Sequence, residues 1–178
     1  APSRITSIGL VDLDNDGDLD IVVGAVDSYE ALTWYENDGA SNPTFSETLI
    51  TTVNSPNHPG DIILEDIDAD GDIDILYSSA NGDHIKLYEN DGAESPSFTE
   101  KNIALGFNGV NAIKTADLDA DGDLDVIGGG RNEIKWYEND FAFDTQNLTF
   151  KENQITYGIP SYEGEFEVTK TSIGANDS

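Results

Sequence analysis

Residues 12–20 read DLDNDGDLD, and nearly the same nine residues return as DIDADGDID at 66–74 and DLDADGDLD at 117–125. Each copy has aspartate at positions 1, 3, 5, 7 and 9 and glycine at position 6. Two like charges about 4 Å apart repel by roughly 1 kcal/mol in bulk water and roughly 4 kcal/mol at an effective dielectric near 20. A compact loop brings several such pairs together, so the pattern predicts a site for a hard divalent cation in each copy.

The ligand chemistry of the loops favours calcium. Ligation by oxygen alone selects hard cations, and a flexible turn suits calcium better than the strict octahedron of magnesium. An EF-hand is excluded because it needs glutamate at position 12, where this chain has Val23, Tyr77 and Gly128. An acidic turn without an ion is the alternative for a single copy, but three copies in register argue against it.

Two further motifs follow each loop in a fixed order. The first is WYENDG at 34–39, LYENDG at 87–92 and WYEND at 136–140, and the second ends in phenylalanine at 45, 98 and 150. The three landmarks define a repeat of about 50 residues, the size of a propeller blade. We place the repeats at residues 1–55, 56–106 and 107–158, with an incomplete fourth unit at 159–178.

Each repeat contains four short segments that are typical of strands. We expect them at residues 5–11, 19–25, 32–36 and 45–51, then at 62–65, 73–78, 85–89 and 98–103, and finally at 112–116, 124–128, 133–138 and 150–155. No segment shows the apolar period of about 3.6 residues that indicates a helix. The sequence therefore predicts an all-β protein of three four-stranded antiparallel propeller-type blades.

An extra C-terminal strand is expected at residues 166–172, followed by a loop without the aspartates. A closed propeller has about four to eight blades. Three blades and one strand stay open unless other copies or missing sequence complete them, and open sheet edges are normally covered in natural proteins.

The acidic loops and the apolar tails after them resemble the FG-GAP/VCBS repeats, the calcium-binding blades of integrin alpha-subunit heads and of many secreted microbial proteins. The resemblance implies about one calcium ion per repeat, held by side chains at positions 1, 3, 5 and 9 and by the backbone carbonyl of position 7. The implied ligands are Asp12, Asp14, Asp16, Asp18 and Asp20, then Asp66, Asp68, Asp70, Asp72 and Asp74, and finally Asp117, Asp119, Asp121, Asp123 and Asp125. Gly17, Gly71 and Gly122 are implied to form the sharp turn.

Composition narrows the partners and the compartment. The 178 residues carry a net charge of −28, which argues against nucleic acid and anionic membranes as partners. The sequence contains no apolar run of about 18 residues, the length that a membrane-spanning helix needs. It also contains no cysteine, which excludes a disulfide scaffold. Low-affinity calcium modules are common outside cells, and the chain begins at Ala1 without methionine, so we expect a secreted or cell-surface protein whose N-terminal segment was removed. Glycosylation sequons at Asn147 and Asn176 are compatible with secretion.

The remaining motifs have simpler interpretations. The recurring aromatic pairs favour packing between blades over sugar-stacking platforms, and the Glu-Asn-Asp-Gly motif favours turn formation over a second ion site. His58 and His84 are expected in surface loops. Evenly repeated residues do not indicate the unique set that an active site needs, so we expect no enzyme.

The expected function is a secreted, calcium-binding repeat protein with a structural or adhesive role. Its open blade faces and its C-terminal strand are expected to join copies into a fibre or ring. The alternative is an extracellular module that binds a protein or glycan, as a fragment of a larger adhesin or enzyme.

Overall fold

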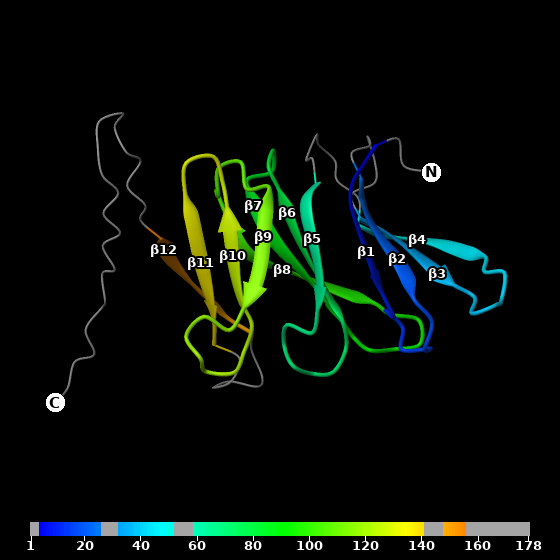
Figure 1. The fold of residues 1–178 in the computed structure, drawn as a ribbon. Coiled ribbons are helices and arrows are strands. Elements are labelled where there is room, and N and C mark those ends of the chain that lie inside the picture. The colour runs from blue at the N-terminus through cyan, green and yellow to red at the C-terminus, as the bar shows by residue number, and fades with distance from the viewer. Residues whose placement is uncertain (1–3, 26–31, 52–58, 141–147, 156–178) are drawn as a thin grey trace.

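The computed structural model describes residues 4–25, 32–51, 59–140 and 148–155, and within these ranges it contains twelve strands and no helix. The strands form three separate sheets of four, each built from consecutive strands that pair antiparallel in the order of the chain (Figure 1). None of the sheets closes on itself. The prediction of an all-β chain with three four-stranded, propeller-type blades is confirmed.

The strand bounds are close to those expected from the sequence. Sheet 1 contains β1 (Ile5–Val11), β2 (Asp20–Ala25), β3 (Leu32–Asn37) and β4 (Phe45–Thr51). Sheet 2 contains β5 (Pro59–Glu65), β6 (Asp74–Ser79), β7 (His84–Asn90) and β8 (Phe98–Leu105). Sheet 3 contains β9 (Ala112–Ala116), β10 (Asp125–Gly129), β11 (Ile134–Asn139) and β12 (Phe150–Ile155). The boundaries between repeats stay a prediction.

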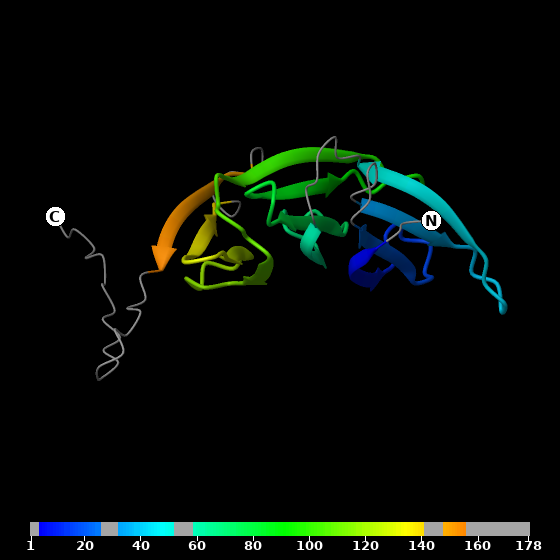
Figure 2. The ribbon, with the colours of Figure 1, turned by 90° about the horizontal axis from the view of Figure 1, so that it is seen from above.

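The three sheets stand side by side along an arc, as a view from above shows (Figure 2). The first strands β1, β5 and β9 line the concave side, and the fourth strands β4, β8 and β12 follow the convex side. β6 is buried along its whole length, whereas most of β4 is exposed. Burial therefore differs sharply between an inner strand of one sheet and the fourth strand of another.

Two apolar cores lie between neighbouring sheets. The core between sheets 1 and 2 includes Leu13, Val22, Trp34, Ile75 and Tyr88. The core between sheets 2 and 3 is built from the corresponding surfaces of those sheets and includes Ile67, Leu87, Phe107, Val126 and Tyr137. Each sheet of the repeat thus buries an apolar face against the next sheet, which a single blade could not do alone.

The aromatic motif supplies part of both cores, which confirms packing as its role at four positions. Trp34, Leu87, Tyr88 and Tyr137 are buried. The placement of His84 in a surface loop is wrong: this residue begins β7, is buried, and packs against the Tyr77 ring with 5.8 Å between ring centroids. The residues before His84 are typical of a loop, so nothing in the sequence indicates that the strand begins at His84, one residue earlier than expected.

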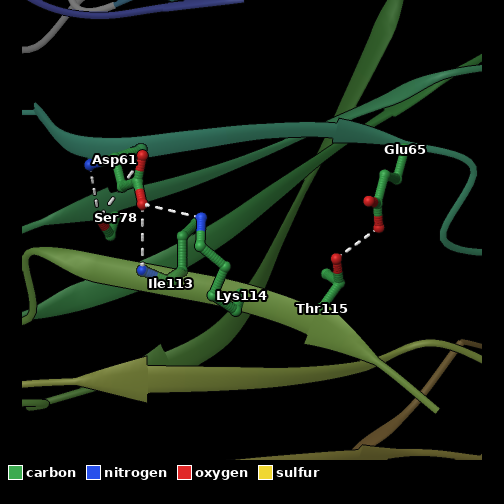
Figure 3. Close-up of polar contacts among 6 residues, drawn as sticks. All are labelled: Asp61, Glu65, Ser78, Ile113, Lys114 and Thr115. Carbon is green, nitrogen blue, oxygen red and sulfur yellow. Dashed lines mark hydrogen bonds and ion pairs between the residues drawn. The ribbon is translucent and has the colours of Figure 1, made fainter.

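Polar contacts join the concave strands of sheets 2 and 3 (Figure 3). The carboxylate of Asp61 on β5 accepts a 3.4 Å hydrogen bond from the Ile113 amide on β9 and lies 3.8 Å from the ammonium of Lys114. At the other end of β5, Glu65 accepts a hydrogen bond from the Thr115 hydroxyl. These contacts fix the register of the two strands at the inner rim of the arc.

Some expectations lie outside the described residues. They are the C-terminal strand at 166–172, His58, and the sequons at Asn147 and Asn176. Within the ranges that the structure describes, no helix has the length and apolar character needed to cross a membrane.

Candidate metal centres

Each acidic loop connects the first strand of a sheet to its second, and all three loops lie at the same edge of the arc, the lower edge in Figure 1. The loops of sheets 1 and 2 touch, because the Asn15 amide donates a 2.8 Å hydrogen bond to Asp72 Oδ1. The repeat therefore gathers its carboxylates into one row along this edge.

Positive backbone angles bend every loop in the same two places. Position 4 has φ of 60° at Asn15, 57° at Ala69 and 67° at Ala120. The glycine at position 6 has φ of 97°, 102° and 105° in the three loops, a region that other residues rarely adopt. The expectation that Gly17, Gly71 and Gly122 form the sharp turn is confirmed.

The carboxylates organise the loop by accepting hydrogen bonds from its own backbone. In the first two loops, position 1 accepts from the glycine amide at 3.0 Å. Position 3 accepts from the amide of position 5 at 3.3 Å in all three loops. Position 5 accepts from the amide of position 7 at 2.9, 2.9 and 3.2 Å. Alternate carboxylates are thus held on the inside of one turn.

Three carboxylates meet in each loop, with one ligand oxygen from each lying within 4.8 Å of the others. The three clusters are Asp12, Asp14 and Asp16; Asp66, Asp68 and Asp74; and Asp117, Asp119 and Asp121. Two oxygens bound to one calcium ion at about 2.4 Å are at most about 5 Å apart. The spacing within each cluster is therefore compatible with three ligands on one calcium ion.

The other predicted ligands lie outside these clusters. They are Asp18, Asp20, Asp70, Asp72, Asp123 and Asp125. The clusters contain no side chain from position 7, and ligation through the carbonyl oxygens of these residues stays a prediction. The assignment of all fifteen aspartates to ligation stays a prediction.

Position 9 has a second role that the sequence did not reveal. Asp20 accepts from the Leu13 amide at 3.2 Å with one oxygen and from the Asn37 amide at 2.9 Å with the other. Asp74 makes the same pair of bonds to Ile67 and Asn90, and Asp125 makes it to Leu118 and Asn139. This buried carboxylate therefore joins the loop to the third strand of its own sheet.

Burial makes negative charge costly in the second loop. It raises the pKa of Asp74 to about 7 and, together with the nearby charge of Asp70, raises the pKa of Asp68 to about 6. Burial also raises the pKa of Asp14 in the first loop. Such carboxylates are stabilised in their ionised form by an adjacent cation.

The glutamate of the Tyr-Glu-Asn motif acts electrostatically on the acidic loops. The negative charge of Glu89 acts on Asp68, that of Glu36 acts on Asp14, and that of Asp121 acts on Glu138. Lys101 pairs with Glu89, and Lys151 pairs with Glu138 at 2.7 Å. The sequence feature that could have indicated this interaction is the fixed position of the glutamate on the third strand of each sheet. That strand pairs with the strand that leaves the loop.

The remainder of that motif forms a turn, as predicted. Asp38 accepts hydrogen bonds from the Ala40 and Thr44 amides at 3.2 and 3.0 Å, and Asp91 accepts the equivalent bonds from Ala93 and Ser97. Gly39 and Gly92 both have φ of 64°.

The residues present fit a hard divalent cation. Every side chain in the clusters offers carboxylate oxygen, the ligand that calcium prefers. Asp12 Oδ1 is buried and has no hydrogen-bond partner among the described residues, although burying such an atom unpaired is unfavourable. Asp12, Asp66 and Asp117, with their cluster partners, are the residues that would hold the ion.

A comparison with known families found a match for the repeats. A family model described as an FG-GAP-like repeat matches residues 12–77 and again residues 66–128, so the matches together cover well over half of the chain. Each match runs from an acidic loop into the strand that leaves the next acidic loop. A search of curated proteins found no match.

Proposed function

The chain belongs to the FG-GAP-like repeat family, and we propose that it is a calcium-binding extracellular protein with a structural or adhesive role. Repeats of this family usually occur in extracellular proteins. The observation that carries the proposal is the row of three carboxylate clusters, each with a spacing that is compatible with ligation of one calcium ion. The proposal assigns no catalytic reaction to the chain.

Calcium has a mechanical role in this proposal. The bound ion supplies positive charge at the turn between the first and second strands of each sheet. Asp14 and Asp68 are buried in these turns, where ionised carboxylates are unfavourable without a partner. The loops carry fifteen of the 36 acidic residues, so neutralising them removes much of the repulsion along the row.

The structural role rests on the two outer sheets of the arc. Exposed large apolar side chains include Ile8, Leu10 and Phe45 on sheet 1 and Leu118 and Ile155 on sheet 3. Exposed apolar patches of this kind mark interaction sites. We propose that copies of the chain associate through these surfaces into a fibre or ring.

A second candidate is a module that binds an extracellular protein or glycan. Tyr35 and Trp136 are only half-buried, unlike the other members of the aromatic motif, and aromatic rings are common sugar-stacking surfaces. Calcium-loaded monomers that bind a glycan array would favour this candidate over self-association.

Calorimetric titration of metal-free protein with calcium tests the metal assignment. We expect binding at about three sites and a marked rise in the melting temperature. A site whose ligand is at 100 times Kd adds about 2.7 kcal/mol to stability. Magnesium is the matched control and should give a smaller rise, because it requires a rigid octahedral shell. No heat of binding and an unchanged melting temperature would contradict the assignment.

Sedimentation velocity and negative-stain microscopy test the structural role. The protein is compared in excess calcium and in excess chelator over a range of protein concentrations. Fibres or rings in calcium support association. A calcium-loaded chain that remains monomeric at every concentration contradicts it and leaves the calcium assignment standing.

A further inference from the structure

We infer that sheet 3 of one molecule docks on sheet 1 of a second copy, head to tail, by repeating the contact that joins neighbouring sheets inside the chain. This inference rests on the self-association proposed above and specifies its surface. We call the outward side of sheet 1 the leading face and the outward side of sheet 3, with its acidic loop, the trailing face.

The leading face repeats the surface that sheet 2 turns toward sheet 1. On sheet 2, Ile62, Leu64, Ile73 and Phe98 pack against the core between those sheets. Register and spacing give their equivalents on sheet 1, which are Ile8, Leu10, Leu19 and Phe45. All four are exposed. Sheet 1 thus presents one half of a blade contact.

The trailing face repeats the surface that sheet 2 turns toward sheet 3. There, Ile67, Leu76, Ile85, Leu87 and Ile103 are buried in the second core. The equivalent positions on sheet 3 are all apolar and at least partly exposed: Leu118, Ile127, Ile134, Trp136 and Ile155. Sheet 3 presents the other half of the same contact.

Leucine 118 shows the difference most clearly. Its counterparts Leu13 and Ile67 are 1% and 2% exposed because the following sheet covers them, whereas Leu118 is 45% exposed. The third loop is accordingly the most exposed of the three, with Asp117, Asp119 and Asp121 all at the surface. A further sheet on the trailing face would cover both the apolar side chain and the loop.

One hydrogen bond recurs at each contact between sheets of the chain. The residues equivalent to its donor and its acceptor are present on the two outer faces. The side-chain amide of Asn90 in sheet 2 donates a 3.0 Å hydrogen bond to the Leu13 carbonyl of sheet 1. The side-chain amide of Asn139 in sheet 3 donates a 3.1 Å hydrogen bond to the Ile67 carbonyl of sheet 2. On the leading face, the side-chain amide of Asn37 donates to the Leu19 carbonyl of its own sheet at 3.1 Å, and no hydrogen bond among the described residues joins it to another sheet. The Leu118 carbonyl occupies the matching place on the trailing face, at the loop position of Leu13 and Ile67.

The two faces therefore complement each other, which identifies the occupant as a second copy of the chain. A head-to-tail contact of this kind uses different surfaces on the two molecules and gives a ring if the rotation closes and a filament if it does not. It also brings the third acidic loop of one copy beside the first loop of the next. Copies that each carry a net charge of −28 then associate only when cations neutralise these loops.

Engineered disulfides test the docking, because the natural chain contains no cysteine. Asn15 and Asp72 touch across the first internal contact, and their counterparts across the proposed contact are Ala120 of one copy and Asp18 of the next. Cysteines at such a pair can link when their Cα atoms lie about 4.4–6.8 Å apart. The test variant is Ala120→Cys with Asp18→Cys, oxidised in calcium.

Two matched variants complete the design. Asn15→Cys with Asp72→Cys should close a disulfide within one chain. Ala69→Cys with Asp18→Cys places the same two residue types at positions that meet neither within a chain nor across the proposed contact.

The inference predicts a ladder of linked oligomers for the test variant, none for the mismatched pair, and loss of the ladder in chelator. Oligomers of the unmodified chain without a ladder would overturn the docking while leaving self-association intact. A chain that stays monomeric in calcium would overturn both the docking and the self-association. Two other findings would also overturn both: that residues 156–178 cover the outer faces, or that a different protein binds there.

Discussion

At the scale of single residues, the ninth aspartate of each loop has two structural bonds in addition to any bond to a metal. Asp20 accepts from amides of its own loop and of β3, and Asp74 and Asp125 do the same in their sheets. The sequence predicts the positions of the aspartates and the glycine turn, because both follow from local charge and backbone geometry. It does not predict this bond to a strand 14 to 17 residues away, because the partner is a backbone amide that any residue carries.

Asp20→Asn separates the structural role of this residue from metal binding. Asp20 is fully buried and lies outside the carboxylate cluster of its loop. An amide nitrogen does not accept a hydrogen bond, so at least one buried backbone amide loses its partner, at about 1–3 kcal/mol. We expect the free energy of unfolding, measured with urea, to fall by that amount in calcium and also in chelator.

The control for this measurement is Glu94→Gln, which removes one negative charge from an exposed loop residue. It should change stability by less than about 0.5 kcal/mol. A loss for Asp20→Asn that disappears in chelator would show that Asp20 acts only as a metal ligand.

Gly71→Ala tests the cost of the loop conformation itself. A methyl group at Gly71 meets no atom within 4 Å, so the substitution changes only the backbone preference at φ of 102°. Strain of this kind costs about 1–3 kcal/mol. We expect chemical denaturation in saturating calcium to show that loss. Gly129→Ala is the matched control: its nearest contact is an ordinary 3.8 Å in β10, and no loss is expected there.

At the scale of strands and sheets, local pattern predicts the elements better than their contacts. The apolar runs beside each loop give twelve strands with bounds that are within three residues of those observed. The sequence indicates only a turn for the asparagine of the Glu-Asn-Asp motif. In the structure, Asn90 and Asn139 also donate a hydrogen bond to the acidic loop of the preceding sheet. The bond spans 77 residues in one case and 72 in the other, so no local pattern reveals it.

Asn90→Ala and Asn37→Ala form a matched pair that isolates this inter-sheet bond. Both asparagines donate to a carbonyl of their own sheet at 3.1 Å and accept from a glycine amide, but only Asn90 also reaches the preceding sheet, at Leu13. Leaving that buried carbonyl unpaired costs about 1–3 kcal/mol. We expect Asn90→Ala to lose that much more stability than Asn37→Ala in urea denaturation of dilute monomer. Equal losses would show that the inter-sheet bond contributes nothing.

At the scale of the whole molecule, three repeats are too few to close a propeller, so the sequence predicts an open arrangement unless other copies or missing sequence complete it. It does not predict which side chains the opening exposes. That depends on how each sheet turns its two faces toward its neighbours, and only the packing shows that Leu118 occupies a position that is buried in the other two repeats. The outer faces thus follow from combining the repeat with its observed interfaces.

Leu118→Glu tests this conclusion in solution. Full burial of a leucine contributes about 1.5–3 kcal/mol, and a charge in its place must lose its hydration. We expect the protein concentration needed for association in calcium to rise at least about tenfold, equivalent to about 1.4 kcal/mol. The melting temperature of the monomer should stay nearly constant, because Leu118 is already largely exposed and the hydrogen bond from its backbone amide to Asp125 is kept.

Leu105→Glu is the matched control, since Leu105 is 70% exposed at the end of β8 and lies on neither outer face. Sedimentation velocity of both variants measures the difference, and equal association by the two would place the contact elsewhere on the molecule.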